Sequence, residues 1–269
     1  MAENEVLMIV DEIRFADACR DVLTANHVRE SIGTYAEKTQ HLVLKRYFEP
    51  DTSFHEIPHH GFIADIRRDD NIIEIQTSTF GAMRRKLEVF LEDSDVTVVY
   101  PVPYIKHLSW IAADRTISEP RLSPKRSSAA ELLPNLIFIK QYLSHPHLHF
   151  IVAMLEVEEY RNLDGWGSGG KRGSTRYDRI PTKLHELIEI RSMLDLHKVL
   201  PFDVGETFSA QMLRRKTHLS PRGTYTAMRV LRDTGTIIPV EKESRTMIYR
   251  VATAVEQLNY LLAPKGEEE

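Results

Sequence analysis

Three polar side chains interrupt two otherwise apolar runs between residues 61 and 77. Asp65 lies in the first run, GFIADI, while Glu74 and Gln76 lie in the second, NIIEIQT. Side chains two residues apart in a strand project from the same face, so Glu74 and Gln76 would point together. Two neighbouring carboxylates repel each other and are costly to bury unless a cation lies between them. The spacing therefore indicates a divalent-cation site, and Mg²⁺ is the ion that one or two carboxylates hold while it keeps water and phosphate ligands.

The elements around these residues would bring the acids together. The alternation of apolar and polar residues predicts a β-hairpin that turns at RRDDN and places Asp65 opposite or diagonal to Glu74. We expect a helix over about 31–48 before the hairpin, a helix over 80–92 after it, and then a strand over 96–102. The run VTVVYPV in that last strand is typical of burial on both faces of a sheet. The competing interpretation is that both acids lie on the solvated face of an ordinary hairpin.

This order of elements and acids, over about residues 31–102, resembles the PD-(D/E)XK nuclease superfamily. The resemblance implies a mixed α/β (α+β) sheet of the restriction-endonuclease type, flanked by helices, in which Asp65 and Glu74 bind a catalytic Mg²⁺ or Mn²⁺. Glu37 would be the accessory acid on the first core helix. Gln76 occupies the position where the family usually has lysine, so it would orient the attacking water without adding positive charge. Lys86, on the following helix, is a candidate for supplying that charge.

The C-terminal third has the element order of a winged helix-turn-helix domain. A short helix at 208–216 precedes the turn THLSP, a second helix at 221–233 and two short strands. Ser220 and Pro221 suit the cap and first position of the second helix, and in such domains the N-terminal residues of this helix lie near the bases. The predicted DNA-binding residues, which include a basic glycine-rich loop, are Lys171, Arg172, Arg176, Lys216, Ser220, Arg222, Thr224, Tyr225 and Arg229. The alternative is a protein–protein module.

The remaining segments complete the predicted organisation. We expect two domains, a nuclease-like domain over 1–180 and a winged helix over 201–269, joined by a connecting helix over 181–200. The expected elements within the first part are helices at 5–25 and 129–143, strands at 54–57 and 148–160, and a loop at 162–179.

Charge is distributed unevenly along the chain. The net charge is −4, yet residues 161–183 carry a net +4 and residues 205–232 a net +5. Two basic islands in an acidic chain indicate a polyanionic partner, here DNA, and the alternative, more common for charge runs in general, is two solvated faces. His59 and His60 are candidates for contacts with phosphate or for exposed turn residues. His145, His147 and His149 alternate like metal ligands, but no fourth ligand is evident.

Composition narrows the class of protein. No apolar run reaches the roughly 20 residues of a membrane span, and Cys19 is the only cysteine. We therefore expect a cytoplasmic DNA-binding protein without a membrane partner, for which a homodimer is also compatible. The leading hypothesis is a metal-dependent DNA endonuclease. Its alternatives are a non-catalytic DNA-binding protein on a degenerate nuclease fold, and an enzyme of another class that binds a nucleotide at the sheet.

Overall fold

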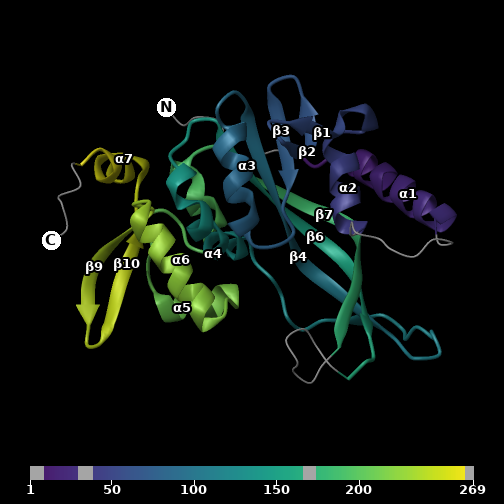
Figure 1. Cartoon of the computed structure of the whole chain (residues 1–269). Helices are drawn as coiled ribbons and strands as arrows, with labels where there is room; N and C mark the ends of the chain where they lie inside the picture. Colours follow the sequence, from purple (N-terminus) through teal and green to yellow (C-terminus); the bar gives the residue numbers. More distant parts are fainter. Residues whose placement is uncertain (1–8, 30–38, 166–173, 264–269) are drawn as a thin grey trace.

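The computed structural model describes residues 9–29, 39–165 and 174–263 (Figure 1). Within these residues the chain is a mixed α/β protein, built on a seven-stranded sheet and a separate three-stranded sheet. The larger sheet consists of β1 (His55–His59), β2 (Phe62–Arg68), β3 (Asn71–Ile75), β4 (Asp95–Ile111), β5 (Arg121–Leu122), β6 (Leu148–Asn162) and β7 (Thr175–Ile190).

The larger sheet is mixed, with the order β1-β2-β3-β4-β6-β7 and with β5 paired to β4. The predicted hairpin of β2 and β3 is antiparallel, whereas β3 pairs with β4 and β4 pairs with β6 in parallel. The predicted strand 96–102 is the centre of one long strand, β4, which continues to Ile111. Its centre is buried on both faces, as the run of β-branched residues predicts.

Helices cover both faces of this sheet. Helices α1 (Glu12–Arg29) and α2 (Thr39–Phe48) pack on the face that contains Val99 and Ile151. Helix α3 (Met83–Phe90) and the segment 129–143 pack on the face that contains Val98 and Val152. Successive strand residues point to opposite faces, which is why neighbouring valines belong to different cores.

Several predicted helices differ in extent or type. Helix α1 begins at Glu12 rather than at residue 5, and the N-terminal part of the predicted helix 31–48 lies outside the described residues. The predicted helix 129–143 is a series of short turns around α4 (Leu133–Leu136). The 3₁₀ segments of the chain are η1 (Thr52–Phe54), η2 (Phe80–Ala82), η3 (Ala129–Leu132), η4 (Ile137–Tyr142) and η5 (Met193–Val199).

The predicted connecting helix over 181–200 is wrong. Residues up to Ile190 belong to β7, and only η5 follows. The pairing with β6 skips Tyr177, Thr182 and His185, so each is an extra residue in β7. An extra residue reverses which face the following side chains occupy. The extra residues 182 and 185 place the buried positions 181, 184 and 187 three residues apart, and Ile190 is buried three residues later in the core on the opposite face. This spacing imitates the apolar face of a helix.

The C-terminal segment follows its predicted element order. Helices α5 (Ala210–Thr217) and α6 (Pro221–Asp233) precede the hairpin of β9 (Ile237–Glu243) and β10 (Thr246–Val251). Strand β8 (Thr207–Ser209) adds a third strand beside β10. The Ser220 hydroxyl accepts the Gly223 N–H at 3.0 Å and so caps α6, as expected. A final helix, α7 (Ala254–Leu262), was not predicted.

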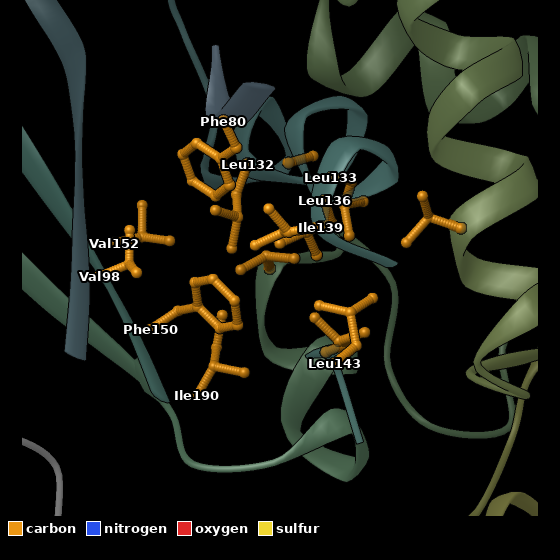
Figure 2. Packing of buried hydrophobic residues seen from close by; sticks show 14 of the residues in the cluster. Phe80, Val98, Leu132, Leu133, Leu136, Ile139, Leu143, Phe150, Val152 and Ile190 are labelled. Atoms are coloured by element: carbon orange, nitrogen blue, oxygen red, sulfur yellow. The ribbon is translucent and has the colours of Figure 1, made fainter. Parts of the chain in front are cut away.

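One apolar core joins the sheet to the C-terminal helices. The cluster that contains Val98 and Val152 of the sheet extends through the segment 129–143 to Leu213, Ala227 and other buried residues of α5 and α6. Figure 2 shows Val98, Val152 and Phe150 facing Leu132, Leu136 and Ile139 across this core. The segment 129–143 therefore fills the space between the sheet and the C-terminal helices.

Candidate metal centre in the β2–β3 hairpin

The hairpin brings Asp65 and Glu74 together at its open end. Its backbone register runs from Arg68 opposite Asn71 to Ile66 opposite Ile73. Beyond that pair, the two acidic side chains join the strands. Asp65 Oδ2 accepts the Ile75 N–H at 2.8 Å, and Glu74 Oε1 accepts the Asp65 N–H at 3.2 Å. Each carboxylate is thus fixed by the backbone of the opposite strand.

Each acid also contacts a cationic or titratable side chain from a different helix. His41 of α2 places Nε2 3.0 Å from Asp65 Oδ2. Lys86 of α3 places Nζ 2.7 Å from Glu74 Oε2 and also donates to the Ile63 carbonyl at 2.7 Å. The Glu74 side chain is only 4% exposed, and that of Asp65 is 16% exposed. The pair is therefore almost removed from water.

The two carboxyl groups differ in their affinity for protons. Burial raises the pKa of Glu74 to about 7, and the neighbouring charge of Asp65 adds to this rise against the opposing effect of Lys86. Burial also acts to raise the pKa of Asp65, but the hydrogen bond and charge of His41, with the Ile75 N–H and Lys86, bring it below its usual range. Asp65 therefore ionises first, and Glu74 is the acid of the pair that holds a proton more tightly. A divalent cation favours the ionised form of both acids.

Gln76 lies two residues beyond Glu74 and is tied to the turn that follows. Its Nε2 donates to Ser78 Oγ at 2.9 Å and to the Thr79 carbonyl at 2.8 Å. The amide nitrogen has two protons, so these contacts use both donors and leave the side-chain carbonyl oxygen as an acceptor. The cation that pairs with Glu74 is Lys86, which was the candidate from the sequence, and position 76 contributes no charge.

Glu37 and His41 are the remaining residues to compare with the site predicted from the sequence. Glu37 lies outside the described residues, so its role as an accessory acid stays a prediction. His41 was not among the predicted site residues. The available signal was its position one helical turn after Glu37 in the predicted helix, since residues four apart share a helix face.

A basic face is exposed along α6. Arg222, Tyr225, Arg229 and Arg232 are exposed at spacings of three, four and three residues, which places them on one side of the helix. Tyr225 is 74% exposed, although it is a large aromatic residue. Thr224 was expected among the DNA contacts, but it is 4% exposed and its hydroxyl donates to the Ser220 carbonyl. The structure removes Thr224 from this surface because it faces the core.

The remaining predicted DNA contacts are more dispersed. Lys171 and Arg172 lie outside the described residues, and Arg176 is exposed on β7. Lys216 donates to the Pro201 carbonyl at 3.0 Å and lies over the Phe202 ring, 4.5 Å from its centroid. The Ser220 hydroxyl oxygen is engaged as the cap of α6.

The basic island at 161–183 is partly neutralised by a residue outside it. Glu159 of β6 is 2% exposed, and its two oxygens accept from Arg161 Nη1 at 2.5 Å and from Arg179 Nε at 2.7 Å. Burial alone would raise the pKa of Glu159, but the two guanidinium groups hold it below its usual range. Less positive charge is therefore available to a polyanion here than the sequence count indicates.

Comparison with known proteins places the hairpin inside a family region. Residues 38–191 match the model of a family described as a domain of unknown function, DUF8091, which is more than half of the chain. An uncharacterised protein of Treponema pallidum (strain Nichols) is 29% identical over 221 residues, which are 82% of this chain and 87% of that relative. No solved structure matches significantly. None of the helices in the described ranges has the length and apolar character to cross a membrane. The match from α2 to β7 includes Asp65, Glu74 and Lys86, and by its extent the chain belongs to the DUF8091 family.

Proposed function

We propose that this protein is a nuclease dependent on Mg²⁺ or Mn²⁺ that hydrolyses phosphodiester bonds in DNA. The observation that carries the proposal is the pair of nearly buried carboxylates of Asp65 and Glu74. They lie on adjacent strands, and among the described residues Lys86 is the one permanently charged cation that contacts the pair. Such a pair is under-compensated in charge, and its oxygens are the ligand type that Mg²⁺ prefers.

Each residue of the centre has a separate task in the proposed reaction. Asp65 and Glu74 would hold the cation, which polarises a phosphate oxygen and lowers the pKa of a bound water. Lys86, whose Nζ lies 2.7 Å from Glu74 Oε2, would offset the charge that accumulates on the phosphate. The carbonyl oxygen of Gln76 would accept a hydrogen bond from the attacking water and so orient it. His41 would fix the position of the Asp65 carboxylate.

The C-terminal segment would deliver the DNA. The order β8, α5, α6, β9, β10, with a three-stranded sheet, supports a winged helix-turn-helix in which α6 is the recognition helix. The exposed face of Arg222, Tyr225, Arg229 and Arg232 is basic, and arginine can recognise guanine or phosphate through two parallel hydrogen bonds. The β9–β10 hairpin tip has both acidic and basic residues, so α6 would make the main electrostatic contribution.

A second candidate is a DNA-binding protein that does not cut. The arrangement around Gln76 favours it, because both donors of the amide nitrogen bind the 76–79 turn and position 76 adds no positive charge. Lys86 forms an ion pair with Glu74 at 2.7 Å, which offsets part of the negative charge of the two acids. In this case the sheet would serve as a platform for the DNA-binding segment.

A cleavage assay distinguishes the two candidates. Full-length protein is incubated with linear, nicked and branched DNA in Mg²⁺, Mn²⁺ or EDTA. We expect cleavage by the wild type with either metal, none in EDTA, and none by Glu74→Gln. Asp70→Asn is the matched control, because Asp70 is an exposed acid in the turn of the same hairpin. Wild-type protein that binds these DNAs but cuts none of them with either ion would support the platform instead.

A further inference from the structure

We propose that His59, His60 and Asp93 form a separate binding site for a transition-metal cation, for which Zn²⁺ is the best match. His59 ends β1 and His60 follows it in the turn to β2, while Asp93 lies in the connection between α3 and β4. His59 Nε2 is 3.0 Å from Asp93 Oδ1, and His60 Nε2 is 2.8 Å from Asp93 Oδ2. One ligand atom from each of the three residues lies within 4.8 Å of the other two.

The β1–β2 turn fixes the backbone on which His60 stands. His59 pairs with Phe62, which leaves His60 and Gly61 as the two central residues with φ of 47° and 80°. Positive φ at both positions is the type I′ pattern. Histidine and asparagine are both among the non-glycine residues found most often at positive φ, so either can occupy position 60 in this turn.

Neighbouring groups also fix His59 and Asp93. The His59 side chain is 10% exposed, and its ring centroid lies 5.6 Å from that of Phe90 in α3 and 4.1 Å from that of His60. Ser94 Oγ donates to Asp93 Oδ1 at 2.8 Å. Pre-oriented donors lower the cost of ordering a site when the ligand binds, so this cluster differs from a chance group of mobile surface side chains.

The donor set fits a borderline-soft cation. Two imidazole nitrogens and one carboxylate oxygen suit Zn²⁺, which binds such atoms at about 2.0–2.2 Å in a tetrahedron, whereas Mg²⁺ prefers oxygen ligands alone. Donor atoms in such a tetrahedron are about 3.3 Å apart. Each histidine Nε2 lies close to this distance from one Asp93 oxygen, 3.0 Å to Oδ1 for His59 and 2.8 Å to Oδ2 for His60. The three ligand atoms lie within 4.8 Å of one another, so small side-chain shifts would bring them around one cation. Both Nε2 atoms must offer a lone pair, so any proton on them moves to Nδ1 or is released.

The exposed side of the cluster can accept further ligands. The side chains of His60 and Asp93 are 44% and 45% exposed, which leaves room for a water as the fourth ligand. A bound cation would connect the β1–β2 turn to the end of α3. Lys86 lies on this same helix, so the cation would hold α3 in position against the hairpin that contains Glu74.

The test uses full-length protein freed of metal with a chelator and then titrated with Zn²⁺ or Mg²⁺, with calorimetry and thermal unfolding as readouts. We expect about one Zn²⁺ per chain and a rise in melting temperature, because the cation binds only the folded site. His60→Asn retains a residue that tolerates positive φ, and Asp93→Asn retains the side-chain shape. Each should weaken Zn²⁺ affinity at least ten-fold while the metal-free protein still folds.

Two controls locate the effect. His147→Asn changes a similar exposed contact, His147 Nδ1 to Asp95 Oδ1 at 2.7 Å, and should leave Zn²⁺ affinity unchanged. Glu74→Gln should also leave it unchanged, which separates this site from the proposed nuclease centre. The proposal is overturned if wild-type protein binds no Zn²⁺. It is equally overturned if His60→Asn and Asp93→Asn bind it as tightly as wild type, or if Glu74→Gln is the variant that loses it.

Discussion

Two glutamates in the same sheet are buried to nearly the same degree but are compensated very differently. Glu74 is 3% exposed and Glu159 is 2% exposed. Glu159 binds two guanidinium groups, and its pKa is lowered; Glu74 binds one ammonium group beside a second carboxylate, and its pKa is raised to about 7. A fully compensated buried acid is a structural ion, whereas an under-compensated one is a candidate to receive a further cation. Burial alone therefore does not identify a functional acid.

The largest expected effect is the loss of cleavage in Glu74→Gln. If Glu74 is a metal ligand, cleavage should fall at least about 1000-fold, or roughly 4 kcal/mol in activation free energy. Glu159→Gln should retain most of the activity of the protein that remains folded. Initial rates on linear DNA at saturating Mg²⁺ measure both. Equal losses in the two variants would remove the distinction between the glutamates.

The next effect is on stability and concerns the other glutamate. Arg179→Met removes one of the two guanidinium groups from Glu159 and leaves the buried carboxylate with Arg161 alone. Breaking a buried ion pair costs about 3–5 kcal/mol, and we expect about 3 kcal/mol here because Arg161 remains. Lys86→Met should cost less, since Glu74 can take up a proton. Urea unfolding of the two variants provides the comparison, and a larger loss for Lys86→Met would contradict it.

A change in pH should change the contributions of the two glutamates to folding stability in opposite directions. The folded pKa of Glu159 is lowered, so its contribution to stability is present above the unfolded pKa of about 4.3 and is lost as pH falls. The folded pKa of Glu74 is raised to about 7, so the folded protein binds an extra proton between these values. Stability should therefore decline by about 2 kcal/mol as pH rises from about 4.5 to 7 in EDTA.

Variants assign each part of this pH profile. Glu74→Gln should remove the decline between pH 4.5 and 7, and Glu159→Gln should reduce the loss below pH 4.5. Saturating Mg²⁺ should also remove the decline in the wild type, because a bound cation favours the ionised acid. Thermal unfolding across this pH range tests each expectation. A decline that persists in Glu74→Gln would have to come from another group.

The smallest expected effect separates binding from chemistry. Arg222→Ala should weaken DNA binding by about 1–2 kcal/mol if its guanidinium contacts a base. Glu74→Gln should leave affinity unchanged, because Glu74 lies outside the exposed face of α6. Fluorescence anisotropy with one labelled duplex, at a fixed salt concentration, gives both values. Unchanged affinity in Arg222→Ala would direct the search for the DNA surface away from the start of α6.

Local patterns predicted those parts of the fold that depend on neighbours in sequence. The hairpin at 61–77, the buried strand at 96–102 and helix α6 follow alternation, β-branched residues and a capping serine, and all three are observed. The strand over residues 181–190 was missed because its extra residues give a three-residue period. Helix α7 could have been found, since Thr253 and Glu256 form a capping box that is visible in the sequence.

Long-range contacts in the candidate site could not be predicted in this way. The pairs His41–Asp65 and Arg179–Glu159 join residues from different elements, 24 and 20 positions apart. Only the packing of a helix on the sheet, or the pairing of two long strands, brings them together. The charge count for residues 161–183 failed for the same reason, because Glu159 lies just outside that window but opposite Arg179 in the sheet.

The continuous core between the sheet and α6 has a geometric consequence for the proposed nuclease. Val98 and Val152 in the sheet belong to the same apolar core as Leu132, Leu136 and Ala227 of α6. The proposed DNA-binding helix is therefore packed, through this core, against the sheet whose strands carry Asp65 and Glu74. The distance between α6 and the proposed metal site would then be fixed. The strand break should fall at a constant number of base pairs from the position that α6 occupies, and the distribution of break positions should be narrow.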